Sequence, residues 1–343
     1  YQQLTALFRV EERSTAYAIA SVANVLITVA AMVLFVAVFN WGAVGLAVGN
    51  FTGTLTVYLV LVAYRSEQLG LEFDRTLFRK MQHFGMPLVP SALALWAINF
   101  IDREFIVWYK NLAEVGVYSV AIKVASILTF VMVAFRTAWP AFAYSIDDDR
   151  EARRTYAFVL TYLMALSTWV AVGLGALAPW WVHLLAAKSY FRAEKGVALL
   201  AFAGVAYAGY TVLAIGSGRA RRTQLNWVVT GAGAAVNVGL NFWLIPAYGM
   251  VGASISTAAA YVALFIGMTL YAQHVYPVHY QWRRVVTAVG AGVALTVAAR
   301  ATHLPLVPSF LLVLVYPLVL AALGFYLPAE RRRLSRVFRA AVP

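Results

Sequence analysis

Long apolar stretches alternate with short polar connections along the whole of this 343-residue chain. A helix that crosses a bilayer needs about 17–25 predominantly apolar residues. Ten stretches meet this requirement and are predicted as spans: 14–39, 44–64, 87–109, 117–139, 156–177, 197–216, 227–244, 252–271, 285–301 and 310–327. The pattern therefore predicts an all-α, polytopic membrane helix bundle of about ten spans.

Composition and charge support a membrane protein and orient it. Hydrophobic residues make up 62% of the chain and charged residues 12%, and cysteine is absent, which excludes disulfides and thiolate chemistry. Of the 27 Lys and Arg residues, 19 lie in the terminal segments and alternate connections and 5 lie in the other connections. By the positive-inside rule we expect both termini to be cytoplasmic. The basic tail Arg331–Arg339 then reads as a topology signal that contacts anionic membrane lipids, and not as a nucleic-acid site.

Two external hairpins share the pattern aromatic-Gly-x-Val-Gly. The residues are Trp-Gly-Ala-Val-Gly at 41–45 and Tyr-Gly-Met-Val-Gly at 248–252, which lie 207 residues, or six spans, apart. Parallel repeats of this kind are typical of transporters that rock two lobes around a central site. We therefore predict two pseudo-symmetric six-helix lobes, the first of them incomplete, plus an added C-terminal helix pair. The predicted segments are 1–64 (end of the first lobe), 65–86 (cytoplasmic linker), 87–271 (complete second lobe) and 272–343 (helix pair and tail).

The third span carries three consecutive charges, Asp102, Arg103 and Glu104. Charges at membrane depth are costly and usually face a water-filled cavity or a partner. Asp102 lies seven residues before Tyr109, and Lys123 lies six residues into the next span. At 1.5 Å per residue both lie roughly 10 Å below the outer face, so neighbouring antiparallel helices can place Asp102, Arg103 and Lys123 at one level.

These residues predict the wall of a cationic cavity. Arg103 and Lys123 would hold a pyrophosphate or an acidic sugar, and Asp102 would orient them or accept a coupling proton. The alternative is an ion pair that only holds two helices together. The other candidate cavity residues are Asn99, Trp96, Arg136 and Tyr118. The alternative for Arg136 is contact with the lipid headgroups, and the alternative for Tyr118 is a place at the membrane–water interface. Glu104 is expected at the rim.

No other pattern indicates a cofactor or a metal. Asp147, Asp148 and Asp149 precede a predicted helix, so we interpret them as charges at a helix N-terminus. The five histidines lack the spacing of metal ligands, and the chain has no Walker motif, which argues against an ATPase. We expect energy to come from a proton or sodium gradient, the membrane potential or the downhill flow of cargo.

Three motifs together carry a family resemblance. They are Phe-Gly-Met-Pro-Leu at 84–88, Asp-Arg at 102–103, and Gly-Val-Tyr-Ser-Val-Ala-Ile-Lys at 116–123. The chain resembles the O-antigen-type polysaccharide-biosynthesis flippases of the multidrug/oligosaccharidyl-lipid/polysaccharide exporter superfamily. The resemblance covers the whole chain, from the fifth to the fourteenth helix of the family, so we expect an N-terminally truncated member. It implies a V-shaped pair of lobes around a cavity that opens alternately to each side.

The resemblance also implies a cargo. This would be a lipid-linked oligosaccharide of the polyprenyl-pyrophosphate type, with the last two helices flanking a groove for its lipid tail, as in lipopolysaccharide and cell-envelope assembly. We expect a monomeric transporter that works with polysaccharide assembly proteins. Two alternatives stay open: a multidrug or organic-cation exporter of the same superfamily, and a membrane-embedded polysaccharide polymerase or glycosyltransferase. The first would need a cavity dominated by carboxylates, and the second an external catalytic segment with paired acids.

Overall fold

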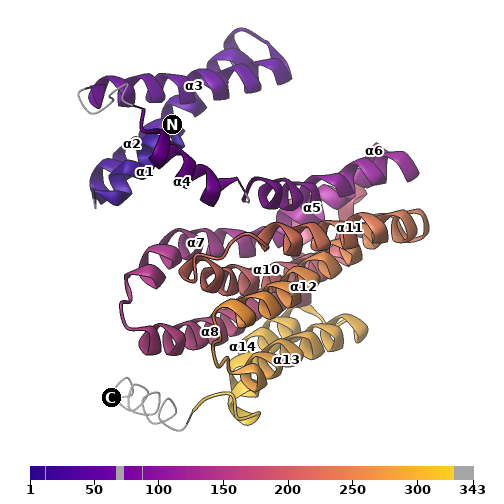
Figure 1. Ribbon diagram of the computed structural model, residues 1–343. Coiled ribbons are helices and arrows are strands. Elements are labelled where there is room, and N and C mark those ends of the chain that lie inside the picture. Colours follow the sequence, from indigo (N-terminus) through magenta and orange to yellow (C-terminus); the bar gives the residue numbers. More distant parts are fainter. Residues whose placement is uncertain (12, 67–72, 87, 328–343) are drawn as a thin grey trace, which may run out of the picture. The chain divides into compact units, whose positions relative to one another are not determined.

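The computed structural model describes residues 1–11, 13–66, 73–86 and 88–327, and all the regular elements in these ranges are helical (Figure 1). The chain divides into two compact units, Tyr1–Phe78 and Arg79–Pro343. The first unit contains four elements before the boundary helix: α1 (Gln2–Val10), α2 (Ser14–Val33), the π-helix η1 (Leu34–Val38) and α3 (Gly42–Tyr64). The all-α prediction is therefore confirmed.

Helix α4 (Arg75–Gly85) crosses the boundary between the units, and the second unit continues with ten α-helices and one short 3-10 helix. These are α5 (Leu88–Tyr109), α6 (Leu112–Ala125), α7 (Ile127–Ser145), α8 (Asp149–Ala176), α9 (Ala178–Leu185), the 3-10 helix η3 (Lys188–Ala193), α10 (Glu194–Arg219), α11 (Asn226–Tyr248), α12 (Met250–Val275), α13 (Trp282–Ala301) and α14 (Leu306–Ala322). The connection 178–196, between two of the predicted spans, is thus largely helical.

Each of the ten predicted spans falls on helix, but fewer helices qualify as complete spans. Within the described residues, eight helices are long and apolar enough to cross a bilayer, or nine if α4 and α5 are counted as one bent span. Helix α14 has 17 residues and is shorter than each of these eight helices. Proline lies inside three helices, at Pro140, Pro246 and Pro317. The chain therefore crosses the membrane many times, as the apolar pattern predicts.

The predicted span 117–139 is not a single helix. A one-residue break at Ser126 divides it into α6 and α7. The Ser126 hydroxyl donates to the Lys123 carbonyl oxygen at 2.7 Å, and a local side-chain bond of this kind competes with the helical backbone pattern. The two helices together run from Leu112 to Ser145, which is longer than a bilayer needs.

The core of the second unit lies where α8, α10 and α12 pack together, with α5, α6 and α11 on one side (Figure 1). Small residues allow close approach there: a Cβ added at Gly196 would lie 2.7 Å from the Ser254 hydroxyl of α12. Helices α13 and α14 pack on α8 through a separate cluster that contains Val172, Tyr316 and Leu320. The pair is therefore joined to the unit through α8.

Candidate functional site

Asp102 of α5 is a buried carboxylate that four helices surround. Its side chain is 1% exposed and accepts hydrogen bonds from the Tyr118 hydroxyl of α6 at 2.6 Å, the Thr257 hydroxyl of α12 at 2.5 Å and the Asn241 amide of α11 at 2.7 Å. Three donors on a carboxylate satisfy much of its capacity to accept hydrogen bonds. Among the described residues no cation pairs with Asp102, so the interpretation of Asp102 as half of a helix-holding ion pair is wrong.

Two asparagines of α11 extend this polar cluster. Asn237 and Asn241 are four residues apart, so they share one face of the helix, and both are fully buried. The side-chain nitrogen of Asn241 (Nδ2) donates to the side-chain oxygen of Asn237 (Oδ1) at 3.4 Å. The side-chain oxygen of Asn241 (Oδ1) and the side-chain nitrogen of Asn237 (Nδ2) are buried without a hydrogen-bond partner. The cluster therefore keeps free oxygen capacity beside a carboxylate, which is the ligand chemistry of hard cations.

A cavity of about 480 Å³ opens beside this cluster, between α5, α6, α7, α10 and α12. Tyr118 and Thr257 line it and lie between its interior and Asp102, which is not among the lining residues. Arg103 lines it from α5, where its guanidinium donates to the Asn99 carbonyl oxygen at 2.8 Å and lies 5.3 Å from the centre of the Phe100 ring. Trp96 stacks on that ring, with centroids 5.4 Å apart.

The opposite wall of the cavity presents a second cation. Arg136 of α7 lies 5.2 Å from the centre of the Tyr207 ring of α10. Tyr207 in turn packs against Tyr261 of α12, with ring centroids 5.1 Å apart, and the Tyr261 hydroxyl donates to the Asn99 side-chain oxygen at 3.1 Å. Neither Arg103 nor Arg136 forms an ion pair with any described residue. The charged side chains that line the cavity are thus two arginines flanked by aromatic rings.

Of the seven cavity candidates from the sequence, five line this cavity: Trp96, Asn99, Arg103, Tyr118 and Arg136. Asp102 lies behind it. The structure does not bring Lys123 to it, because α6 turns Tyr118 and Ile122 toward the cavity and successive helical residues point about 100° apart. Lys123 is exposed, as is Glu104. The expected grouping of Lys123 with Asp102 and Arg103 at one site is therefore not formed in this cavity.

Sequence reasoning missed Asn237, Asn241, Thr257, Tyr207 and Tyr261. One signal was available, since two asparagines spaced i and i+4 inside an apolar helix predict a buried polar face. No comparable signal marked Thr257, because Ser and Thr are common in membrane helices and often bond to their own backbone. The Thr257 hydroxyl bonds to Asp102 and also lies 3.0 Å from the backbone carbonyl oxygen of Ala253.

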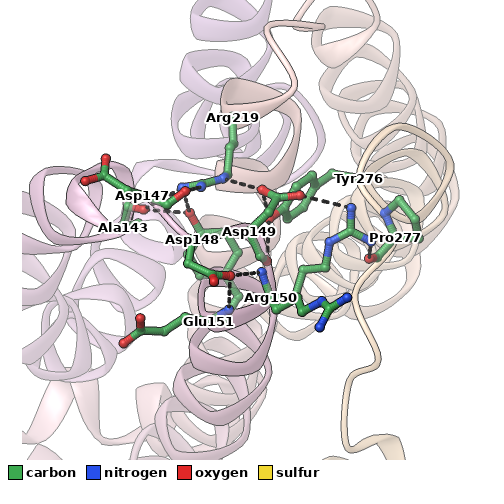
Figure 2. A network of polar contacts seen from close by, with 11 residues as sticks. Ala143, Asp147, Asp148, Asp149, Arg150, Glu151, Arg219, Tyr276 and Pro277 are labelled. Carbon is green, nitrogen blue, oxygen red and sulfur yellow. Dashed lines mark hydrogen bonds and ion pairs between the residues drawn. The ribbon is translucent and has the colours of Figure 1, made fainter.

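The acidic run 147–149 belongs to a different polar network, at the N-terminal end of α8 (Figure 2). Asp148 caps α8, accepting from the backbone N–H groups of Arg150 and Glu151 at 2.6 and 3.1 Å, which confirms the predicted role at a helix N-terminus. Asp149 accepts from Arg219 of α10 at 3.1 Å and from the Tyr276 hydroxyl at 2.9 Å.

Arg153 closes this network onto the connection that leads to α13. It pairs with Asp149 at 3.2 Å and donates to the Pro277 carbonyl oxygen at 2.9 Å. Burial, together with the bond to the Asp149 carboxylate, raises the pKa of Tyr276 to about 12, so the phenol stays protonated as a donor. The network ties the ends of α8, α10 and α12 together and is a structural feature.

Comparison with solved structures identifies two proteins of similar fold. The fold is similar to that of a structure described as the lipid II flippase MurJ in an inward closed conformation, with a TM-score of 0.65, 12% identity and 87% of this chain covered. It is also similar to an outward-facing multidrug resistance MATE family transporter of the MOP superfamily, with a TM-score of 0.60, 13% identity and 86% covered. The chain spans 66% and 65% of those two structures. The fold of this chain is therefore similar to those of the MurJ and MATE structures.

A sequence comparison identifies the family of this chain. The family model described as "Polysaccharide biosynthesis protein" matches residues 1–194, which is more than half of the chain. The chain belongs to this family of polysaccharide biosynthesis proteins. A comparison with curated protein sequences gave no match.

Proposed function

We propose that this chain belongs to a flippase that moves a lipid-linked oligosaccharide across the bacterial cytoplasmic membrane, with the cavity of the second unit as the site for the anionic head group. One observation carries the proposal: the only charged side chains lining the cavity in the described chain are Arg103 and Arg136. Arginine suits the planar, multidentate recognition of phosphate oxygens, and aromatic faces such as Trp96 and Tyr207 suit sugar rings.

The same observation weighs against the two alternatives. A cavity that takes organic cations requires carboxylates aimed into it, whereas Asp102 is screened from the cavity by Tyr118 and Thr257. A glycosyltransferase or polymerase requires paired acids near an acceptor site. The longest external connection expected from the spans, 178–196, has Glu194 as its only carboxylate, and Glu194 pairs with Arg300 at 3.3 Å. Similarity to transporter structures also favours a transporter over an enzyme.

The wider arrangement is proposed from the sequence. Both termini of the chain would be cytoplasmic, 87–271 would form one complete lobe, and 1–64 would end the other. The transporter would act as a monomer, by alternating access, together with polysaccharide assembly proteins, in O-antigen or lipopolysaccharide synthesis. The lipid tail of the cargo would stay in the bilayer while the head group crosses.

We also propose that Asp102 carries the coupling ion, a proton or a sodium ion. The carboxylate, the free Asn241 carbonyl oxygen and the Thr257 hydroxyl supply oxygen ligands within one buried cluster. A cation bound there would replace hydrogen bonds that now link α5 with α11 and α12, so its arrival would be coupled to helix packing next to the cavity. Lys123 has no part in this arrangement.

Complementation tests the cavity. The gene that encodes this chain in full is placed in a flippase-null strain, and surface glycan, accumulated lipid-linked precursor and protein level are compared for wild type, Arg103→Ala and Arg136→Ala. We expect both variants to lose surface glycan and accumulate precursor at normal protein level. Arg154→Ala, an exposed arginine away from the cavity, is the matched control and should match wild type. Normal glycan in both cavity variants would overturn the head-group site.

Ion-dependent stability tests the coupling site. Thermal unfolding of the purified protein is measured in sodium and potassium salts of equal ionic strength, and across pH, for wild type and Asp102→Asn. We expect the stability of wild type to depend on sodium or on pH, and the variant to lose that dependence. Equal responses of wild type and Asp102→Asn to all of these conditions would contradict the role of Asp102.

A further inference from the structure

Helix α4, between the two apolar regions of the chain, has two chemically distinct faces. At 100° per residue, Arg75, Arg79, Lys80 and His83 fall on one side, and Leu77, Phe78 and Met81 fall on the other. Every one of these side chains is exposed. The three apolar ones are exposed by 54%, 44% and 64%, which is unusual for large hydrophobic residues that share one helix face.

Within the part of the chain that the structure describes, the cations of α4 have no acidic partners. Neither Arg75, Arg79 nor Lys80 forms an ion pair with a described residue. The nearest acid in the described chain, Asp74, is engaged elsewhere, because it accepts from the backbone N–H groups of Thr76 and Leu77 at 2.7 and 3.1 Å. It thereby caps the helix and does not neutralise the basic face. The helix therefore offers concentrated positive charge beside an uncovered apolar face.

Helix α4 is unsuited to the bilayer core. Helix α5 alone has 22 residues, or about 33 Å, and so can cross the hydrocarbon core without α4. The two helices meet at a 41° bend, and continuing the span through α4 would carry Arg75, Arg79 and Lys80 into hydrocarbon. A connection that does not cross the membrane starts and ends at the same surface, so α4 is tethered next to the headgroups.

We propose that α4 docks on the surface of the bilayer and binds anionic lipid, with its apolar face inserted at the headgroup boundary and its basic face toward the phosphates. This is the charge and face pattern of interfacial amphipathic helices. The surface in question is the cytoplasmic leaflet predicted from the charge distribution, where anionic lipids attract basic segments. The inference does not depend on which cargo the transporter moves.

The absence of cysteine from the chain allows a direct test. Single variants Met81→Cys, on the apolar face, and His83→Cys, on the polar face, are labelled with an environment-sensitive fluorophore in the full protein. The protein is placed in nanodiscs of phosphatidylcholine, with or without about a third phosphatidylglycerol. Quenching by nitroxide lipids is compared with quenching by aqueous iodide.

We expect the label at Met81 to be quenched by nitroxide lipid and shielded from iodide, and the label at position 83, on the polar face, to behave in the opposite way. The variant R75Q/R79Q/K80Q should lower insertion in anionic nanodiscs about fivefold per charge and leave insertion in neutral nanodiscs unchanged. Arg154→Gln is the matched control and should have no effect. Equal iodide access at both positions, or shielding of Met81 from both quenchers, would overturn the docking. Insertion independent of lipid charge would overturn the recognition of anionic lipid.

Discussion

The α2–α3 and α11–α12 hairpins turn in the same way but differ in how they are packed. The first glycine of each turn has a positive φ, 53° at Gly42 and 57° at Gly249, a conformation that favours glycine. The second glycine of each, Gly45 or Gly252, lies against the backbone of the preceding helix, where a Cβ would meet Phe35 at 3.0 Å or Leu244 at 2.1 Å. Local sequence therefore specifies the turn in both places.

The two hairpins differ in how much of each helix is buried. In α2–η1 and α3, 11% and 22% of the apolar window is buried, against 28% and 50% in α11 and α12. The first pair is therefore less deeply packed than the later one. The reason lies in the neighbours: within the second unit α5 packs on α11 and α10 packs on α12, whereas within the first unit the pair is covered by α1. A shared turn does not ensure shared packing.

Polar content separates them further. At the 207-residue spacing of the hairpins, Asn237 and Asn241 correspond to Ala30 and Leu34, and Thr257 corresponds to the exposed Asn50. The buried hairpin supplies the partners of Asp102, and the exposed hairpin has apolar residues where the asparagines stand. Buried polar groups are tolerated where other helices provide hydrogen bonds. The comparison teaches that the candidate site belongs to the packing environment and not to the hairpin motif.

The largest expected effect comes from the second glycine of the buried hairpin. Gly252→Ala places a Cβ 2.1 Å from the Leu244 carbonyl oxygen, so the two helices must separate, and we expect a loss of about 3 kcal/mol in unfolding free energy. Gly45→Ala, with 3.0 Å contacts, should cost about half as much. Gly231→Ala, where nothing lies within 4 Å, is the control and should stabilise slightly. Unfolding in detergent measures all three, and equal losses at Gly252 and Gly45 would break the comparison.

Removing the amide that bonds to the buried carboxylate should have the next largest effect. Asn241→Leu introduces the residue found at position 34 of the other hairpin and leaves one oxygen of Asp102 without its donor, at a cost of about 2 kcal/mol. The control is Trp243→Leu, because Trp243 is 82% exposed on the same helix and should change stability little. A stable Asn241→Leu protein would show that the amide does not support the Asp102 carboxylate.

A smaller difference is expected between the hydroxyl of α12 and its counterpart in α3. Thr257→Val keeps the shape of the side chain but removes its hydrogen bond to Asp102, so we expect a loss of about 1.5 kcal/mol. Asn50→Val acts at an exposed position and should stay within about 0.5 kcal/mol of wild type. Chemical unfolding measures both variants, and equal losses of unfolding free energy would show that the two hairpins do not differ at this position.

The smallest effect concerns the ion pair of the first unit. Arg65, which directly follows α3, donates to Glu11 through two bonds, at 2.8 and 2.9 Å, and this hydrogen bonding holds the pKa of Glu11 below its usual value of 4.5. A lowered carboxyl pKa contributes stability at pH values above the unfolded pKa, and this stability is lost as the pH falls through the lowered value. We expect backbone hydrogen exchange near α1 to rise below about pH 4. Arg65→Gln should remove this acid-dependent step, and an unchanged step would exclude the ion pair as its source.

Much of the site follows from helical spacing within single segments. Trp96, Asn99 and Arg103 lie three or four residues apart, so one helix necessarily presents them together, and the structure places all three in the cavity lining. For Arg136 the sequence predicts either headgroup contact or a place at the cavity mouth, because its distance from the helix end fits both. The cation–π contact with Tyr207 of α10 places it in the cavity.

The sequence by itself determined the apolar helices, the two glycine turns and the presence of charge at membrane depth, because each depends on residues close together in the chain. Only the tertiary structure decided that Asp102 meets Asn241 and Thr257, which lie 139 and 155 residues away, and that Lys123 turns outward from the cavity while Tyr118 turns in. These outcomes depend on how far each helix is rotated about its axis. That rotation is set by packing against distant helices, which no local spacing specifies.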